Sequence, residues 1–212
     1  MIAGVDGTPG GWLVAVVEAR SLVRWHRVPD AAAVLAVTAD CAVVGVDMAL
    51  RLPDAGYRRC DVEARVHLGP ARSSMFHAPV KAVLDAVDYP HACAISREVN
   101  GKAISKQTWH IVPKMREWQR VPLPANVVEV HPETTFRVLD RRITDNKRST
   151  RGLAQRLIAL RAFVDVPEVL ADLPVGPSMD DALDALAAAR SAHRLLVGES
   201  LSLGDPPHLI EV

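Results

Sequence analysis

The sequence predicts an α/β protein whose mixed five-stranded sheet has three antiparallel strands followed by parallel ones, with helices on its faces. Two observations support this fold class. Three apolar runs near the start are joined by short, turn-forming links, as in antiparallel strands, and they span residues 2–6, 12–19 and 22–28. Two later apolar runs, 41–50 and 125–133, are separated by helical patterns and resemble strands buried on both faces.

The chain has 212 residues, 49% of them hydrophobic, which suits a single domain over residues 1–212 with one substantial core. We expect a helical insertion at about 51–125, between strands four and five. The sequence begins directly with strand and contains no apolar run long enough for a membrane helix, so we expect a cytoplasmic protein without a membrane partner. The three cysteines lack CxxC pairing and predict buried, reduced thiols.

Each element has a local signal. Gly7, Gly10 and Gly11 allow the tight turn between the first two strands, and Pro29-Asp30 begins a helix over 31–39. In the insertion, glycines end helices over 58–68 and 91–99. The remaining segments follow similar patterns: a loop at 72–76 and helices at 79–87, 105–119, 134–142, 152–163, 168–173 and 178–197.

Single carboxylates stand inside the apolar segments. Asp6 ends the first strand, Asp47 and Glu129 interrupt the fourth and fifth, and Asp184 is the only charge in the stretch 182–189. An ionised carboxylate in such surroundings costs several kcal/mol unless something compensates it. These four acids are therefore the candidate catalytic residues.

Simpler interpretations exist for some of these acids. Asp6 is also an ordinary residue for opening a turn, and Asp47 for capping the turn before Pro53. Asp181 lies one helical turn before Asp184 and on the same face. With Ser178 it also fits a capping box at the start of the last helix, so capping and chemistry both remain open for Asp181.

The order of elements is that of the ribonuclease H-like fold, in which strand one lies beside strand four and the last helix covers their shared edge. Neighbouring strands are about 4.8 Å apart, so acids that end both strands would nearly touch. A divalent cation would relieve their repulsion. Oxygen ligands without Cys or His favour Mg²⁺ or Mn²⁺, with Asp6, Asp47, Asp181 and Asp184 as ligands.

Several short motifs resemble those of a family of predicted nucleases named domain of unknown function 429. The motifs extend over nearly the whole chain: Gly4-Val5-Asp6-Gly7, Gly45-Val46-Asp47, Arg59-Cys60-Asp61 with Ala64-Arg65, Arg72-Ser73-Ser74-Met75-Phe76, Glu129-Val130-His131-Pro132-Glu133 and Asp181-Ala182-Leu183-Asp184-Ala185-Leu186-Ala187. The last is also similar to the closing helix of Holliday-junction resolvases, which carries two metal-binding acids. The resemblance implies a metal-dependent phosphodiesterase with a ribonuclease H-like fold.

We therefore predict a nuclease that hydrolyses phosphodiester bonds of DNA or RNA with two metal ions. Asp6 would bridge the ions, Asp47 and Asp184 would each hold one side, and Asp181 with Glu129 or Glu133 would complete the set.

The zero net charge hides two basic blocks, 51–120 with 12 basic and 7 acidic residues, and 137–161 with 8 and 2. They provide candidate nucleic-acid contacts at Arg59, Arg72, Lys106 and Arg148. Trp109 and Trp118 lie among basic residues on the 105–119 helix, where they either stack on bases or belong to the core.

Two alternatives stay open. Asp6-Gly7-Thr8 resembles the first phosphate loop of actin-like phosphotransferases and ATPases, although no second Asp-Gly-Thr follows. A non-catalytic nucleic-acid-binding or scaffold protein is the other. The sequence leaves the oligomeric state open.

Overall fold

The computed structural model describes residues 1–212 and contains a five-stranded sheet in the order β3-β2-β1-β4-β5. Its strands are β1 (Ile2–Thr8), β2 (Gly11–Ala19), β3 (Leu22–Val28), β4 (Val43–Val46) and β5 (Val127–Glu129). The first three pair antiparallel, whereas β4 is parallel to both β1 and β5. The predicted mixed α/β sheet is confirmed.

Strand β1 continues two residues beyond its predicted end at Asp6. Antiparallel pairing with β2 extends to Thr8 opposite Gly11, so the turn falls on Pro9 and Gly10 instead of on Gly7. Gly10 has a φ of 78°, which favours glycine. Asp6 therefore lies within the strand, with its backbone held by the sheet.

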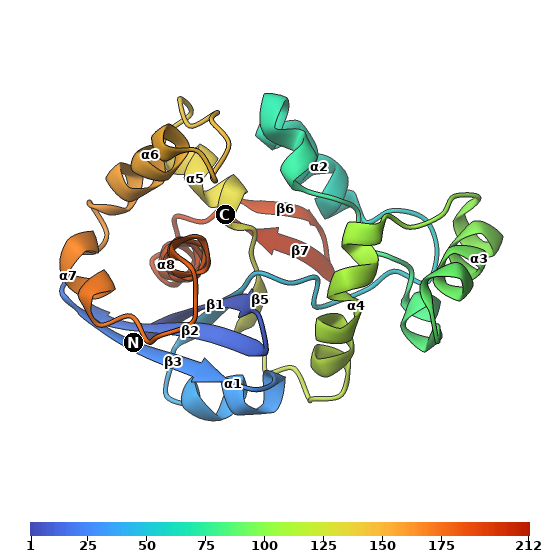
Figure 1. Ribbon diagram of the computed structural model, residues 1–212, viewed down its shortest axis with the longest axis horizontal. Helices are drawn as coiled ribbons and strands as arrows, with labels where there is room; N and C mark the ends of the chain where they lie inside the picture. Colours follow the sequence, from blue (N-terminus) through green and yellow to red (C-terminus); the bar gives the residue numbers. More distant parts are fainter.

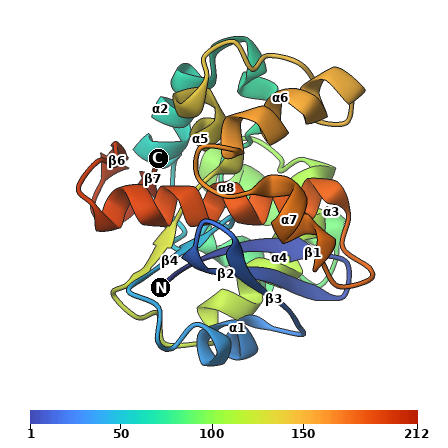
Figure 2. The ribbon, with the colours of Figure 1, turned by 90° about the vertical axis from the view of Figure 1, so that its left-hand side faces the viewer.

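Helices cover both faces of this sheet, as Figures 1 and 2 show. On one face lies α8 (Met179–Leu196), accompanied by α5 (Pro132–Leu139), α6 (Thr150–Leu160) and α7 (Val166–Ala171). The other face packs against α1 (Ala31–Val37) and the end of α4 (Lys106–Gln119). Cys41, Cys60 and Cys93 are buried and unpaired, as expected. None of the helices has both the length and the apolar character needed to cross a membrane.

The segment between β4 and β5 is helical, as predicted. It contains α2 (Arg59–Leu68), η1 (Gly69–Ser74), η2 (Lys81–Asp85), α3 (Tyr89–Asn100) and α4. The predicted loop at 72–76 is partly the 3₁₀ turn η1, and the predicted helix at 79–87 is the short 3₁₀ turn η2. Trp118 is 2% exposed and packs in the core, which favours the core interpretation for this tryptophan.

A C-terminal hairpin was not predicted. Strands β6 (Ser202–Asp205) and β7 (His208–Glu211) pair with each other and pack against α2. Leu203, Ile210 and Val212 join Cys60, Ala64 and Leu68 in a separate small core. Each strand has only four residues, too few for a clear alternating pattern.

Two glycines let α8 approach the sheet backbone closely. Gly4 on β1 and Gly45 on β4 are neighbours in the parallel register. A Cβ atom at Gly4 would lie 2.0 Å from the Ala185 carbonyl oxygen, and one at Gly45 would lie 2.5 Å from that of Ala188. The buried alanines of α8 therefore rest almost directly on the two strands, where no larger side chain fits.

Replacing Gly45 with alanine should destabilise the protein by about 3 kcal/mol, because the helix backbone must move away from the sheet. Gly56→Ala is a suitable control. Unlike Gly45, Gly56 has a positive φ, but nothing lies within 4 Å of the position that an added Cβ would take, so only backbone strain of about 1 to 2 kcal/mol is expected. Urea unfolding measures both. Equal losses would contradict the close contact.

Candidate metal centre

Three carboxylates converge where β1, β4 and α8 meet. Asp6 lies on β1, Asp47 directly follows β4, and Asp184 lies in the second turn of α8. One oxygen from each of the three carboxylates lies within 4.8 Å of the other two. Asp6 and Asp184 are 8% and 5% exposed, and Asp47 is partly buried. The sequence prediction that Asp6, Asp47 and Asp184 converge is thus confirmed.

The glycine contact explains this convergence. Side chains two residues apart on a strand point to the same face, so Asp6 faces the same layer as Gly4, and Asp47 follows Gly45 by the same spacing. Asp184 precedes Ala185, which touches Gly4. The backbone of Asp47 is also tied to β1, since its N–H donates to the Val5 carbonyl at 2.9 Å. Asp6 and Asp184 lie within regular elements, and this hydrogen bond holds the backbone of Asp47 beside β1.

Burial and mutual repulsion make the ionised cluster unfavourable. Burial raises the pKa of Asp6 well above its ordinary value, and the charges of Asp184, Asp47 and Asp181 raise it further. Burial, with Asp184 as the next cause, raises the pKa of Asp47 to about 8. Burial also raises the pKa of Asp184 to about 6, although Lys147 acts in the opposite direction. The cluster therefore favours bound cations or protons.

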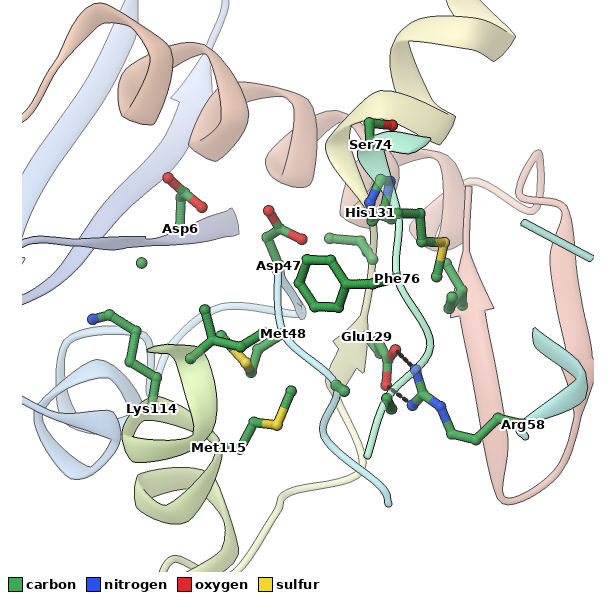
Figure 3. Close-up of a pocket in the computed structure, with 17 residues that line it drawn as sticks. Asp6, Asp47, Met48, Arg58, Ser74, Phe76, Lys114, Met115, Glu129 and His131 are labelled. Atoms are coloured by element: carbon green, nitrogen blue, oxygen red, sulfur yellow. Dashed lines mark hydrogen bonds and ion pairs between the residues drawn. The ribbon is translucent and has the colours of Figure 1, made fainter. Parts of the chain in front are cut away.

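Two lysines supply positive charge at this site. Lys147, in the segment between α5 and α6, donates to Asp184 at 2.5 Å and pairs with Asp180 at 3.3 Å. Burial lowers the pKa of Lys147, but Asp184, Asp180 and Asp47 raise it above its usual value. Figure 3 shows the second lysine, Lys114, below Asp6. Its side chain runs along Gly7, and its ammonium donates to the Gly11 carbonyl. Neither lysine was among the predicted nucleic-acid contacts.

Asp181 is placed beside the three acids but has another task. Its Oδ2 accepts hydrogen bonds from the Ser178 backbone at 2.8 Å and from the Thr8 hydroxyl at 3.1 Å. With Ser178 it forms a complete capping box at the start of α8. The structure therefore bears out the capping interpretation, and Asp181 does not belong to the group of three acids. Its neighbour Asp180 pairs with Lys147.

Glu129 is compensated by an arginine rather than by the acid cluster. The buried Arg58 binds both carboxylate oxygens of Glu129, at 2.7 and 2.8 Å, and also pairs with Asp61 (Figure 3). The Leu50 N–H adds a third hydrogen bond to Glu129, at 3.0 Å. This bidentate pair explains how an acid survives in the fifth strand. The geometry gives Glu129 a structural partner, not a place among the three acids.

Glu133 is likewise paired, through both oxygens, with Arg156 at 2.6 and 3.0 Å. The four predicted phosphate contacts are all exposed: Arg59, Arg72, Lys106 and Arg148. Arg59 is engaged by Glu63 and Asp205. None of these four residues lines the cavity beside Asp6 and Asp47.

The donor set suits a hard divalent cation. Three carboxylates offer only oxygen ligands, which Mg²⁺ and Mn²⁺ prefer, and their repulsion disappears when a cation binds. Lys147 already neutralises part of the Asp184 charge, so it would compete with a cation for that carboxylate. Asp6, Asp47 and Asp184 therefore fit the metal site expected from the sequence.

Fold and site together define an α/β protein that gathers carboxylates from two parallel strands and its last helix. Residues 4–209 match the family described as "Protein of unknown function (DUF429)", and the chain belongs to this family. No curated protein and no solved structure matches the chain.

Replacing Glu129 with alanine should destabilise the protein by about 3 to 5 kcal/mol, because it leaves Arg58 buried with only part of its partner charge. Asp47→Asn should not have this effect, since it removes a repelling charge. Chemical unfolding in EDTA compares the two variants. A Glu129 variant as stable as the wild type, with weakened Mg²⁺ binding, would instead place Glu129 in the metal site.

The acid cluster should make the metal-free protein less stable as pH rises. Unfolded Asp has a pKa near 3.9, whereas the folded values are about 6 for Asp184 and about 8 for Asp47, so the folded state holds extra protons between these limits. Stability is therefore present at low pH and is lost as pH rises from about 4 to about 8. Asp47→Asn should show a shallower loss.

Thermal unfolding in EDTA between pH 5 and pH 8.5 measures this difference, and added Mg²⁺ should stabilise the wild type more at pH 8 than at pH 5. Identical pH slopes for the wild type and the Asp47 variant would contradict the expected protonation.

Proposed function

We propose that the protein has a ribonuclease H-like fold and is a Mg²⁺- or Mn²⁺-dependent nuclease that hydrolyses phosphodiester bonds of DNA or RNA. The observation that carries the proposal is the convergence of Asp6, Asp47 and Asp184, whose oxygens lie within 4.8 Å of one another. Asp6 and Asp47 directly follow Val5 and Val46, the last parallel pair of β1 and β4, at the edge where open α/β sheets place their ligands. The proposed fold rests on the element order and on the last helix over β1 and β4.

Bound divalent cations would activate water for in-line attack on phosphorus and stabilise the charge that develops on the leaving oxygen. The protein residues have defined parts in this proposal. The charges of Asp184, Asp47 and Asp181 all raise the pKa of Asp6, so Asp6 would be the ligand shared between the cations. Asp47 and Asp184 would each hold one side of the cation site.

The two lysines fit a phosphate group better than the exposed arginines do. Lys147 contacts Asp184 directly, and Lys114 lies against Gly7, next to Asp6. Their ammonium groups flank the acids and would neutralise a phosphate held there. Such contacts bind nucleic acid without regard to sequence and weaken as salt rises.

Asp6→Asn and Asp184→Asn should each lower cleavage of DNA or RNA by about a thousandfold, equivalent to about 4 kcal/mol of transition-state stabilisation. Single-stranded and structured substrates should be assayed with Mg²⁺, Mn²⁺ and EDTA. Asp172→Asn, an exposed acid at the end of α7, is the matched control and should keep wild-type activity.

Asp6→Asn and Asp184→Asn should also bind nucleic acid more tightly than the wild type in EDTA, because each removes a negative charge that repels the phosphates. Fluorescence anisotropy measures this affinity. Nucleotide binding without cleavage of any strand would favour a phosphotransferase. Binding of nucleic acid with no metal-dependent cleavage would favour a non-catalytic protein.

A further inference from the structure

A cavity of about 240 Å³ opens directly beside the acids. Asp6 and Asp47 form one side of it, and most of the remaining wall is apolar. Figure 3 shows Phe76 reaching into this space alongside Asp47, with Met48 and Met115 below. Methionine side chains adapt to flat rings and make favourable contacts with them. The cavity therefore joins a charged site to a surface suited to an aromatic ring.

The size of the cavity favours one ring system. A cavity of about 150 Å³ binds benzene, and sites for drug-sized ligands begin at about 300 Å³. At about 240 Å³, this cavity has room for one planar heteroaromatic group and not for two stacked ones.

Phe76 is free to contact such a group. It is only partly buried, it belongs to none of the hydrophobic clusters, and its ring has no aromatic or cationic partner in the structure. The ring follows the η1 turn, whose own residues are mostly exposed. A phenylalanine that contributes nothing to the core, yet enters a cavity beside clustered acids, is placed to stack on a ligand.

His131 offers a polar group in the same cavity. Its Nδ1 is buried without a hydrogen-bond partner. A buried polar atom without a partner is unfavourable and is uncommon in folded proteins, unless water or a ligand satisfies it. The edge of a nucleobase carries donors and acceptors that would pair with this nitrogen if the ring turned toward the cavity.

We propose that this cavity holds one unstacked nucleobase of the strand whose phosphate lies at Asp6 and Asp47, with Phe76 as the stacking surface. The inference rests on the nuclease function proposed above and deepens it. Since the base must leave its neighbours to enter, the preferred substrate has unpaired nucleotides at the cleavage site, and a fully paired duplex is cleaved poorly. Stacking of a base on an aromatic side chain contributes about 1 to 3 kcal/mol without sequence preference.

The test uses Phe76→Leu, which keeps the apolar volume but removes the aromatic face, and Phe76→Tyr, which keeps the ring. Tyr57→Leu is the matched control: Tyr57 is 49% exposed, stacks on His77 at 4.2 Å, and does not line the cavity. Each protein is assayed on a single-stranded oligonucleotide and on the same strand with an abasic position beside the cleavage site.

For the wild type, the abasic strand should be cleaved about tenfold less well in kcat/KM, within the range given by one stacked base. Phe76→Leu should lower kcat/KM about tenfold on the normal strand. On the abasic strand it should cause no further loss, because the missing base and the missing ring remove the same interaction. Phe76→Tyr and Tyr57→Leu should behave like the wild type. Cleavage that depends on neither the base nor Phe76 would overturn the pocket and leave the nuclease function intact.

A binding measurement separates the two proposals. A strand carrying 2-aminopurine is titrated with protein in Ca²⁺, and stacking on Phe76 should quench its fluorescence in the wild type but not in Phe76→Leu. If this quenching occurs but no strand is cleaved in the Mg²⁺ and Mn²⁺ assays, the base pocket is supported and the nuclease function is contradicted. Equal quenching of the free 2-aminopurine nucleotide at the same concentration would overturn recognition of a strand. Neither quenching nor cleavage would overturn both.

Discussion

The contact between α8 and the two glycines of the central strands determines the rest of the site. Gly4 and Gly45 have no side chains, so the buried alanines of α8 pack directly on the backbone of β1 and β4. Bulkier residues at any of these places would push the helix away from the sheet. Asp184 would then no longer reach Asp6 and Asp47. Packing between backbones, rather than attraction between side chains, brings these acids together against their repulsion.

Two groups of buried charged side chains lie at this end of the sheet, and their negative charge is compensated in different ways. Arg58 neutralises Glu129 and Asp61 within the protein. Asp61 in turn accepts a hydrogen bond from the Ala78 N–H, so the group joins α2, β5 and the segment leading to η2. The second group, Asp6, Asp47 and Asp184, has only Lys147 in direct contact. In the first group, both carboxylates are paired with an arginine. The second retains unbalanced negative charge and is therefore the one suited to bind something else.

Much of the fold and part of the site could be predicted from the sequence, for identifiable reasons. Strong local signals such as the Ser178 cap and the Gly69 stop placed α8 and α2 within a residue. An acid isolated in an apolar strand signals that compensation is needed, and this signal found Asp6 and Asp47. It cannot tell which kind of compensation occurs, so Glu129 gave the same pattern as Asp47.

The missing parts depend on contacts that are distant in sequence. Arg58 and Glu129 are 71 residues apart, and Lys147 and Asp184 are 37 apart. Nothing local marks either basic residue among the 25 in the chain. The hairpin β6–β7 was missed because its short strands are stabilised by packing on α2 rather than by a pattern of their own.

The order of the three acids along the chain has a consequence for biosynthesis. Asp6 and Asp47 leave the ribosome early, whereas α8 follows only after most of the chain has been made. Until then no helix covers Gly4 and Gly45, and Asp6 and Asp47 lack the third carboxylate, Asp184. A nascent chain, or a fragment released by premature termination, therefore cannot assemble the site. The three carboxylates come together only once the last helix has been completed.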